Sequence, residues 1–376
     1  MKIMWMILFL LLPLLGFAYV FWHIWQLLPF SAWGKTGVVA IGLLALLCMF
    51  ANFTRLRGML SLDGATALYE VGNSTLFILL YLAMTFIVLD IGRLVRLVPR
   101  SLLYNNGTTA LAITALLTAI FVYGNRHYNN KVRQPIALTT DKRLSRPLKL
   151  VMLSDLHLGY HNRRKEFARW VDLINKEKAD AILIAGDIID ISTEPLEQEE
   201  TWREFLRLNA PVYACLGNHE YYSGQPNAQL FYRKADIRLL RDSTAMFDNI
   251  CIIGRDDRTN PARKSVAEMA RMAPDSAYTI VLDHQPYHLE RTEKAAIDFQ
   301  FSGHTHHGQV WPISWITQAI YECAFGPHQR GNTRYYVSSG MGIWGGKFRI
   351  GTRSEYIVAT VTSTAAAEHP KNSSRE

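Results

Sequence analysis

The amino-acid sequence predicts an α/β domain preceded by a helical region that lies in a membrane. From residue 148 onward, apolar runs of strand length alternate with helical stretches, which is typical of a sheet with helical crossovers. Before residue 128 there are four apolar segments of about 20 residues each, the length that crosses a bilayer as a helix. Polar residues that bind metals also follow several of the expected strands.

The four expected membrane spans cover residues 4–25, 36–53, 74–95 and 104–124 of a transmembrane region at 1–128. Trp and Tyr near their ends are typical of a membrane interface. The first segment could be mistaken for a signal peptide, but it lacks a clear small-x-small cleavage site, so we interpret it as a retained anchor. Apolar residues make up 49 % of the 376 residues and charged residues only 19 %, which agrees with a part that lies in lipid.

Basic residues predict how this region is oriented. The formal charge is +8, and residues 1–135 hold ten Lys/Arg against three acids. This placement favours a membrane surface over nucleic acid, which would need a basic patch on the folded domain. Lys and Arg are more frequent at the N-terminus, at 54–73 and after residue 123 than in the other two loops. The positive-inside rule therefore places both termini and the following domain in the cytoplasm.

Several smaller features complete the organisation of the chain. Asp90 lies late in the third span, three residues before Arg93 and without an acid or histidine near it in sequence, so we interpret it as an interfacial ion pair. The four cysteines form no Cys-x-x-Cys pair and are interpreted as free thiols. Residues 129–147 form a basic linker or an entry strand, and 363–376 form a small, polar tail that we expect to be disordered.

The domain expected at 148–362 contains recognisable strands and helices. The helical stretches are 164–176, 196–208 and 264–271. The strands are 148–153, 181–185, 212–216, 278–283 and 297–301.

Metal-binding side chains follow these strands. Asp155 and His157 stand two residues apart after the first strand, so both can point to one cation on an extended backbone. The other fragments are Gly186-Asp187, Gly217-Asn218-His219-Glu220, His284 and Gly303-His304-Thr305-His306. Structural metal sites have four ligands as a rule, whereas seven candidates occur here. A structural metal site or a degenerate scaffold is the alternative interpretation.

This ordered set resembles the calcineurin-like metallophosphoesterase superfamily over about 148–361. The resemblance implies a β-sandwich flanked by helices around two divalent metals. It implies that Asp187 bridges both metals and that His219 is the general acid. The remaining implied ligands are Asp155, His157 and His306 for one metal, and Asn218, His284 and His304 for the other. The runs Gly308-Gln309-Val310 and 336–342 resemble a bacterial branch with N-terminal membrane segments, including UDP-diacylglucosamine hydrolase-like enzymes, which implies an inner-membrane location.

The residue types agree with these roles. A bridging ligand needs two oxygens, as Asp187 has, and the neutral amide of Asn218 limits the negative charge that a phosphate would meet. Nitrogen and oxygen donors without thiolate favour Mn, Fe or Zn. Two such ions would bridge a hydroxide nucleophile for attack on phosphorus, and His219 could donate a proton to the leaving oxygen. Glu220 is expected to be a hydrogen-bond partner.

One departure from the superfamily bears on the substrate. Protein phosphatases of this superfamily carry an arginine shortly after the bridging aspartate, whereas Asp187 is followed by Ile-Ile-Asp-Ile-Ser. Because this arginine is absent, a lipid-linked phosphodiester or pyrophosphate becomes the favoured substrate. The alternatives are a tethered phosphodiesterase for a soluble or nucleotide substrate, and a non-catalytic membrane receptor or scaffold.

The segment after Gln309 is rich in aromatic residues. Trp311, Trp315 and Ala319 have helical spacing, with Ile316 and Ile320 alongside. Such a helix could enter the headgroup layer of a membrane, or it could be an ordinary aromatic cover on the domain.

Overall fold

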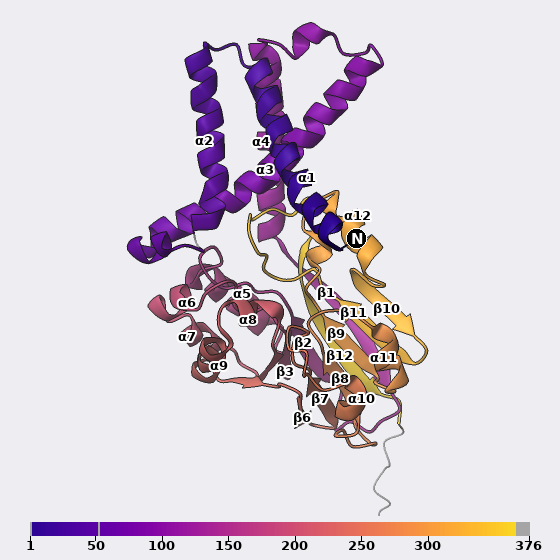
Figure 1. Cartoon of the computed structure of the whole chain (residues 1–376). Helices are drawn as coiled ribbons and strands as arrows, with labels where there is room; N and C mark the ends of the chain where they lie inside the picture. The colour runs from indigo at the N-terminus through magenta and orange to yellow at the C-terminus, as the bar shows by residue number, and fades with distance from the viewer. Residues whose placement is uncertain (1, 52, 366–376) are drawn as a thin grey trace, which may run out of the picture. The chain divides into compact units, whose positions relative to one another are not determined.

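The computed structural model describes residues 2–51 and 53–365, and the chain divides by its internal contacts into two units (Figure 1). Unit 1 comprises residues 1–128 and 345–350, and unit 2 comprises residues 129–344 and 351–376. Most of the tail that was expected to be disordered, residues 366–376 of 363–376, lies outside the described residues.

Unit 1 is helical. Its elements are α1 (Lys2–Leu27), α2 (Ala32–Ala51), η1 (Arg55–Met59), α3 (Leu62–Leu94), η2 (Arg100–Leu102) and α4 (Gly107–Asn129). Among the described residues, α2, α3 and α4 are long and apolar enough to cross a membrane. The part of α1 whose side chains are described, Leu11–Leu27, is apolar but shorter than a full span. The described residues therefore give three candidate spans where the sequence predicted four.

Helix α3 is longer than the span expected at 74–95, because it begins at Leu62. The hydroxyl of Ser61 accepts a hydrogen bond from the backbone N–H of Gly64, which caps the new start. At Gly72 the helix lies so close to α2 that a Cβ atom would be 2.1 Å from the backbone nitrogen of Met49. Small residues permit this close approach of membrane helices.

Asp90 has partners that its sequence neighbours did not predict. The Tyr19 hydroxyl donates to its carboxylate at 2.8 Å, and Nε2 of His23 lies 3.0 Å from the same oxygen. The His23 ring is buried and stacks on Phe86 at 4.6 Å. Our expectation that no histidine lies near Asp90 was wrong, because α1 brings His23 to α3 from 67 residues away.

Residues 345–350 are held by α3 and α4, although they are late in the sequence. The Gly345 N–H donates to the Tyr69 hydroxyl at 3.1 Å, and the Arg349 N–H donates to the carbonyl of Gly124 at 3.0 Å. The Phe348 ring packs edge-on against Phe121 at 4.7 Å. These contacts group the segment with unit 1, inside the range 148–362 that the sequence suggested as one domain.

Unit 2 contains two six-stranded sheets. The first sheet has the order β1-β12-β2-β3-β4-β5, and its strands β2 to β5 run parallel. The second has the order β10-β11-β9-β8-β7-β6, with β7, β8, β9 and β11 parallel. The strands are β1 (Lys131–Thr140), β2 (Leu148–Leu153), β3 (Ala181–Ala185), β4 (Val212–Cys215), β5 (Ile237–Leu239), β6 (Ser243–Phe247), β7 (Ile250–Gly254), β8 (Tyr278–Leu282), β9 (Phe299–Ser302), β10 (Gly326–Arg330), β11 (Thr333–Val337) and β12 (Ser354–Ser363).

The two sheets enclose the main hydrophobic core. Leu150, Met152 and Leu183 of the first sheet share this core with Ile252 and Ile280 of the second. The core also includes Leu138 of β1, so the expected linker or entry strand is a strand here, paired in parallel with β12. Burying apolar faces between two sheets is the standard solution for a sandwich, and the expected α/β sandwich flanked by helices is confirmed.

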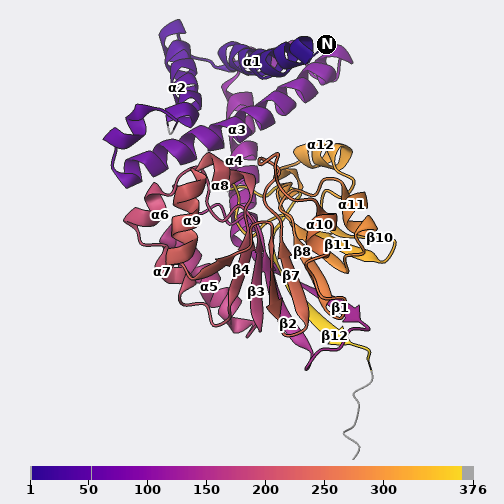
Figure 2. The same ribbon diagram turned by 60° about the horizontal axis from the view of Figure 1, so that its bottom comes forward.

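Helices flank the two sheets, and short helices also lie at the ends of the strands (Figure 2). Those from the first half of the unit are α5 (Arg164–Lys176), α6 (Glu194–Gln198), α7 (Trp202–Phe205), α8 (Asn218–Tyr222) and α9 (Gln225–Lys234). Those from the second half are α10 (Val266–Ala270), α11 (Leu289–Lys294), η3 (His306–Gly308) and α12 (Ile313–Ile320). The helix expected at 196–208 is two short helices, because Glu200 has a left-handed φ of 51° that interrupts the helix.

Candidate metal centre

All seven candidate ligands follow the carboxyl ends of parallel strands. Asp155 and His157 follow β2, Asp187 follows β3, and Asn218 begins α8 just after β4. His284 follows β8, and His304 and His306 follow β9 in the other sheet. Strands that run in the same direction place their following loops at one edge of a sheet, where ligands are bound in α/β proteins. The two sheets thus supply side chains to one place.

Five of the seven candidate ligands adopt left-handed backbone conformations, which are uncommon for residues other than glycine. Their φ angles are 53° for Asp155, 44° for His157, 52° for Asp187, 71° for His304 and 48° for His306. Such conformations cost free energy and concentrate at functional sites. The local strain therefore agrees with a functional role of these loops.

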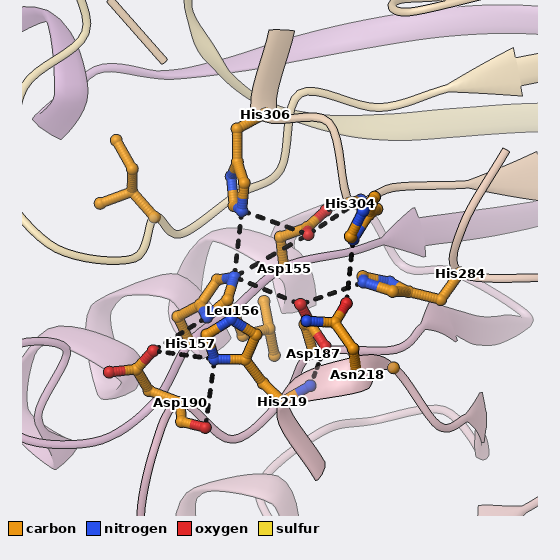
Figure 3. Close-up of polar contacts among 12 residues, drawn as sticks. Asp155, Leu156, His157, Asp187, Asp190, Asn218, His219, His284, His304 and His306 are labelled. Carbon is orange, nitrogen blue, oxygen red and sulfur yellow. Dashed lines mark hydrogen bonds and ion pairs between the residues drawn. The ribbon is translucent and has the colours of Figure 1, made fainter. Parts of the chain in front are cut away.

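The first cluster consists of Asp155, His157 and His306 (Figure 3). The Nε2 atoms of His157 and His306 lie 3.1 Å apart. The Oδ1 atom of Asp155 lies 3.5 Å from Nε2 of His306 and 3.9 Å from Nε2 of His157. All three side chains are buried. Three donor atoms therefore converge from two sheets.

The second cluster contains Asp187, His284 and His304, with Asn218 beside it (Figure 3). Nε2 of His284 lies 3.0 Å from Oδ2 of Asp187, and Nδ1 of His304 lies 2.9 Å from Oδ1 of Asn218. The same Oδ2 of Asp187 lies 3.6 Å from Nε2 of His157 in the first cluster. Asp187 therefore stands between the two clusters.

Two glycines permit the close packing of these loops. At Gly217 a Cβ atom would lie 2.1 Å from Oδ1 of Asp187, and at Gly303 it would lie 2.2 Å from Oδ2 of Asp155. A real Cβ atom does not fit at such distances. A side chain would therefore not fit at the two glycines that precede Asn218 and His304. Both glycines belong to motifs that were identified in the sequence.

The buried carboxylate of Glu220 joins two of the ligand loops. It accepts hydrogen bonds from the backbone N–H groups of Asp187 at 3.1 Å, Ile189 at 3.0 Å and Gly217 at 2.6 Å. A buried carboxylate with several backbone donors fixes the loops that surround it. Glu220 thus acts as the hydrogen-bond partner that the sequence suggested.

His219 lies at the edge of both clusters. Its Nδ1 is 3.2 Å from Oδ1 of Asp190, and its backbone N–H donates to Oδ1 of Asp187 at 2.9 Å. Burial alone would lower the pKa of His219, but the carboxylates of Asp187 and Asp190 raise it to about 9. The carboxylates therefore favour the protonated imidazole. Its Nδ1 faces Asp190, and Nε2 is the other ring nitrogen that could donate a proton.

Asp190 was not singled out in the sequence, and the structure shows it to be a shared partner of two histidines. Its Oδ1 lies 3.2 Å from Nδ1 of His157 as well as from Nδ1 of His219. The side chain is fully buried, and these histidines keep the pKa of Asp190 well below its usual range. The Asp-x-x-Asp spacing from Asp187 was the signal that could have revealed it.

The charged groups of the site favour the binding of cations. Burial and the neighbouring His284 lower the pKa of His304 to about 3, so this ring is neutral and can offer a lone pair. Burial would also lower the pKa of His284, but Asp187 and Asp155 raise it well above its usual value. A site that stabilises a proton on a buried imidazole by nearby carboxylates also favours a metal cation in the proton's place.

The donor set fits a pair of divalent metals. Nε2 of His284 is buried and has no well-aligned hydrogen bond, although a carboxylate oxygen is near it. The Nε2 atoms of His157 and His306 face each other at 3.1 Å, so a cation could take the place of the proton that they share. Imidazole, carboxylate and amide groups are donors that bind divalent cations.

Comparison with known proteins agrees with this geometry. Residues 148–308 match the calcineurin-like phosphoesterase family. An uncharacterized metallophosphoesterase of Campylobacter jejuni is 29 % identical over 252 residues, which cover 65 % of this chain and 67 % of that protein. A transmembrane protein with metallophosphoesterase domain from Bos taurus is 29 % identical over 277 residues, covering 66 % of this chain and 59 % of that protein.

A third relative is a shorter protein, most of which aligns with this chain. The metallophosphoesterase YkuE of Bacillus subtilis is 30 % identical over 232 residues, which cover 57 % of this chain and 79 % of that protein. The resemblance that the motifs indicated is thereby confirmed, and the bovine relative agrees with a membrane-anchored branch. The chain belongs to the calcineurin-like phosphoesterase family.

Proposed function

We propose that this protein is a membrane-anchored phosphohydrolase with two metals, which cleaves a phosphodiester or a pyrophosphate. The observation that supports the proposal is the position of Asp187 between two clusters of nitrogen and oxygen donors. When bound, two divalent cations would activate a water molecule and neutralise charge on the phosphoryl oxygens. By the donor set these cations are Mn, Fe or Zn.

We assign the ligands by cluster. Asp187 would contact both cations. Asp155, His157 and His306 would hold one cation, and Asn218, His284 and His304 would hold the other.

His219 is the proposed general acid. In the reaction the oxygen of water bonds to phosphorus and the water loses a proton to solvent. The bond from phosphorus to the leaving oxygen breaks, His219 gives its proton to that oxygen, and a proton from solvent restores the protonated ring. The carboxylate of Asp190 at Nδ1 keeps the ring oriented and favours its protonated form. The products are a phosphate monoester and an alcohol, or two phosphate monoesters from a diphosphate.

The first experiment tests metal-dependent turnover. Full-length protein in detergent should hydrolyse bis(p-nitrophenyl) phosphate in the presence of Mn²⁺, and Asp187→Ala or exhaustive chelation should abolish the reaction. The exposed Asp141 provides a matched control, since Asp141→Ala should leave the rate unchanged. Activity that survives both Asp187→Ala and chelation would contradict the proposal. Tight phosphoester binding without turnover would instead support a receptor.

We further propose that the substrate is linked to a lipid. Helix α12 supports this, because it exposes 62 % of Trp315, 57 % of Ile316 and 59 % of Ile320. Exposed aromatic and aliphatic side chains on one helix are typical of a surface that enters a lipid interface. The helix begins a few residues after the turn η3, which contains His306, and the backbone of Ile313 would be 2.5 Å from a Cβ atom at Gly308. A lipid-facing surface would therefore adjoin the metal ligands.

A substrate comparison separates the lipid-linked from the soluble alternative. Full-length protein in nanodiscs should hydrolyse a lipid-linked pyrophosphate, such as UDP-diacylglucosamine, faster than a water-soluble glycerophosphodiester or a cyclic nucleotide. Preference for the soluble substrates would show that the membrane region only tethers the enzyme. We expect no nucleic-acid substrate, because the basic residues concentrate near the membrane segments.

We also propose that the protein lies in a bacterial inner membrane with unit 2 in the cytoplasm. The distribution of Lys and Arg beside the apolar segments supports this orientation. Reporter fusions after residue 365 should be active only for a reporter that functions in the cytoplasm, and the reverse result would invert the topology.

A further inference from the structure

We propose that Arg258, stacked on Tyr287, binds an anionic phosphate group of the substrate next to the phosphate that is cleaved. This inference rests on the proposed function and deepens it, because it favours a diphosphate over a simple phosphodiester. The site that we infer consists of Arg258, Tyr287 and Tyr321, and we call it the arginine–tyrosine ledge.

The ledge adjoins the second metal cluster through ring contacts. The guanidinium carbon of Arg258 lies 4.1 Å from the centre of the Tyr287 ring. The Tyr287 hydroxyl donates to the Tyr321 hydroxyl at 3.0 Å, and the two rings are 4.8 Å apart. The Tyr321 ring is 6.2 Å from the ring of His304 and packs edge-on against it. Three contacts thus connect Arg258 to a proposed metal ligand.

Arg258 differs from the other arginines of its loop because its charge is not neutralised. Arg255 and Arg263 both pair with the buried Asp283, at 2.8 Å and 3.0 Å. Arg241 pairs with Asp256 at 2.7 Å. Among the described residues, no carboxylate lies within 4.0 Å of Arg258, and its side chain is exposed. This unpaired charge, which two tyrosine rings connect to a proposed metal ligand, is available to an anionic ligand.

The geometry of the ledge is suitable for a phosphate. A guanidinium that lies flat on an aromatic ring is held in place by the cation–π attraction, while its N–H groups point outward from the edge of the plane. Such edges bind phosphate oxygens in a bidentate manner. Because the Tyr287 hydroxyl donates to Tyr321, the proton of the Tyr321 hydroxyl remains available for an acceptor on the ligand. The ledge therefore offers several donors for anionic oxygens.

The ledge supplies a cation that the loop after Asp187 lacks. No arginine follows Asp187 in the run Ile188–Ser192, so that loop offers no guanidinium for a phosphoryl group. His304, a proposed ligand of the second metal, is the member of that cluster that contacts the ledge, through the Tyr321 ring. A substrate with two adjacent phosphates could therefore place one at the metals and the other on Arg258.

The test measures how two inhibitors bind to the Mn²⁺-loaded full-length protein. Inorganic phosphate carries one phosphoryl group, whereas methylenediphosphonate carries two and is not hydrolysed. Calorimetric titration at a fixed free Mn²⁺ concentration should show that Arg258→Gln weakens methylenediphosphonate binding by at least about tenfold, since a charge-assisted bidentate contact is lost. Binding of phosphate should change less than about twofold.

Arg238→Gln is the matched control, because Arg238 also lies over a tyrosine ring, 5.7 Å from the centre of Tyr213, on strand β5. It should leave both affinities unchanged. An equal loss for both inhibitors, or no loss for methylenediphosphonate, would overturn the inference. The readout is binding and not turnover, so a lack of hydrolysis would count against the proposed function and leave the assignment of the ledge testable.

Discussion

Oδ1 of Asp190 lies 3.2 Å from Nδ1 of His157 and 3.2 Å from Nδ1 of His219. One buried carboxylate therefore orients a proposed metal ligand and the proposed proton donor together. Carboxylates that hold ligand histidines fix the ring orientation and increase the basicity of the free nitrogen. Asp190 is thus a positioning residue for both functions of the site.

The first prediction concerns Asp190→Asn, which removes the charge and keeps the shape. The amide cannot stabilise the protonated form of His219, and it holds His157 less firmly. Metal affinity and kcat should each fall by about 10- to 100-fold, while KM changes little. Calorimetric metal titration and steady-state kinetics measure the two effects, with Asp141→Asn as control. Unchanged metal affinity and kcat would show that Asp190 has only a packing role.

The second prediction tests the proton donor with leaving groups of different basicity. His219→Gln should slow hydrolysis of a phenyl or alkyl phosphodiester by about 10²- to 10⁴-fold, because these leaving oxygens need a proton. The loss should be much smaller for p-nitrophenol, which leaves readily as an anion. Kinetic comparison of both substrates with wild type and variant gives the answer. Equal losses for both substrates would remove His219 from the role of general acid.

A third prediction follows from the contact between Gly217 and Asp187. In Gly217→Ala the added Cβ would lie 2.1 Å from Oδ1 of Asp187, so the loop must move. Overpacking of this kind costs about 1–3 kcal/mol of stability, and we expect a lower Tm together with weaker binding of Mn²⁺. Gly58→Ala is the control, because no atom lies within 4 Å of its added Cβ. Normal metal binding in Gly217→Ala would contradict the close approach.

The fourth prediction concerns the lipid-facing surface of α12. A fluorescent probe attached at Ile316→Cys should show blue-shifted emission in nanodiscs and should be quenched by brominated lipids. Cys48 is replaced by Ser in this background, because the other three cysteines are buried. A probe at Leu206→Cys, which is also exposed in unit 2, should remain in water. Equal emission from the two probes would exclude α12 as a membrane-contacting helix.

Much of the fold could be predicted because its signals are local. The strand β2 and the helix α5 lie within the expected ranges, since an apolar run and an amphipathic repeat are read from neighbouring residues. The helix expected at 196–208 was wrong, because a left-handed turn at Glu200 depends on packing that the pattern does not contain. Similarly, α3 starts at Leu62, where polar residues hid the helical signal.

By itself, the sequence determined which residues could hold metals, because Asp155, His157 and the glycine-led motifs appear as short patterns at strand ends. Only the tertiary structure decided which distant groups meet them. Asp190 contacts His219 across 29 residues, His23 reaches Asp90 on another helix, and Arg258 reaches His304 through two tyrosines. The physical reason is that a side chain's partners depend on how strands and helices pack, and contacts between distant segments leave no local periodicity in a single chain.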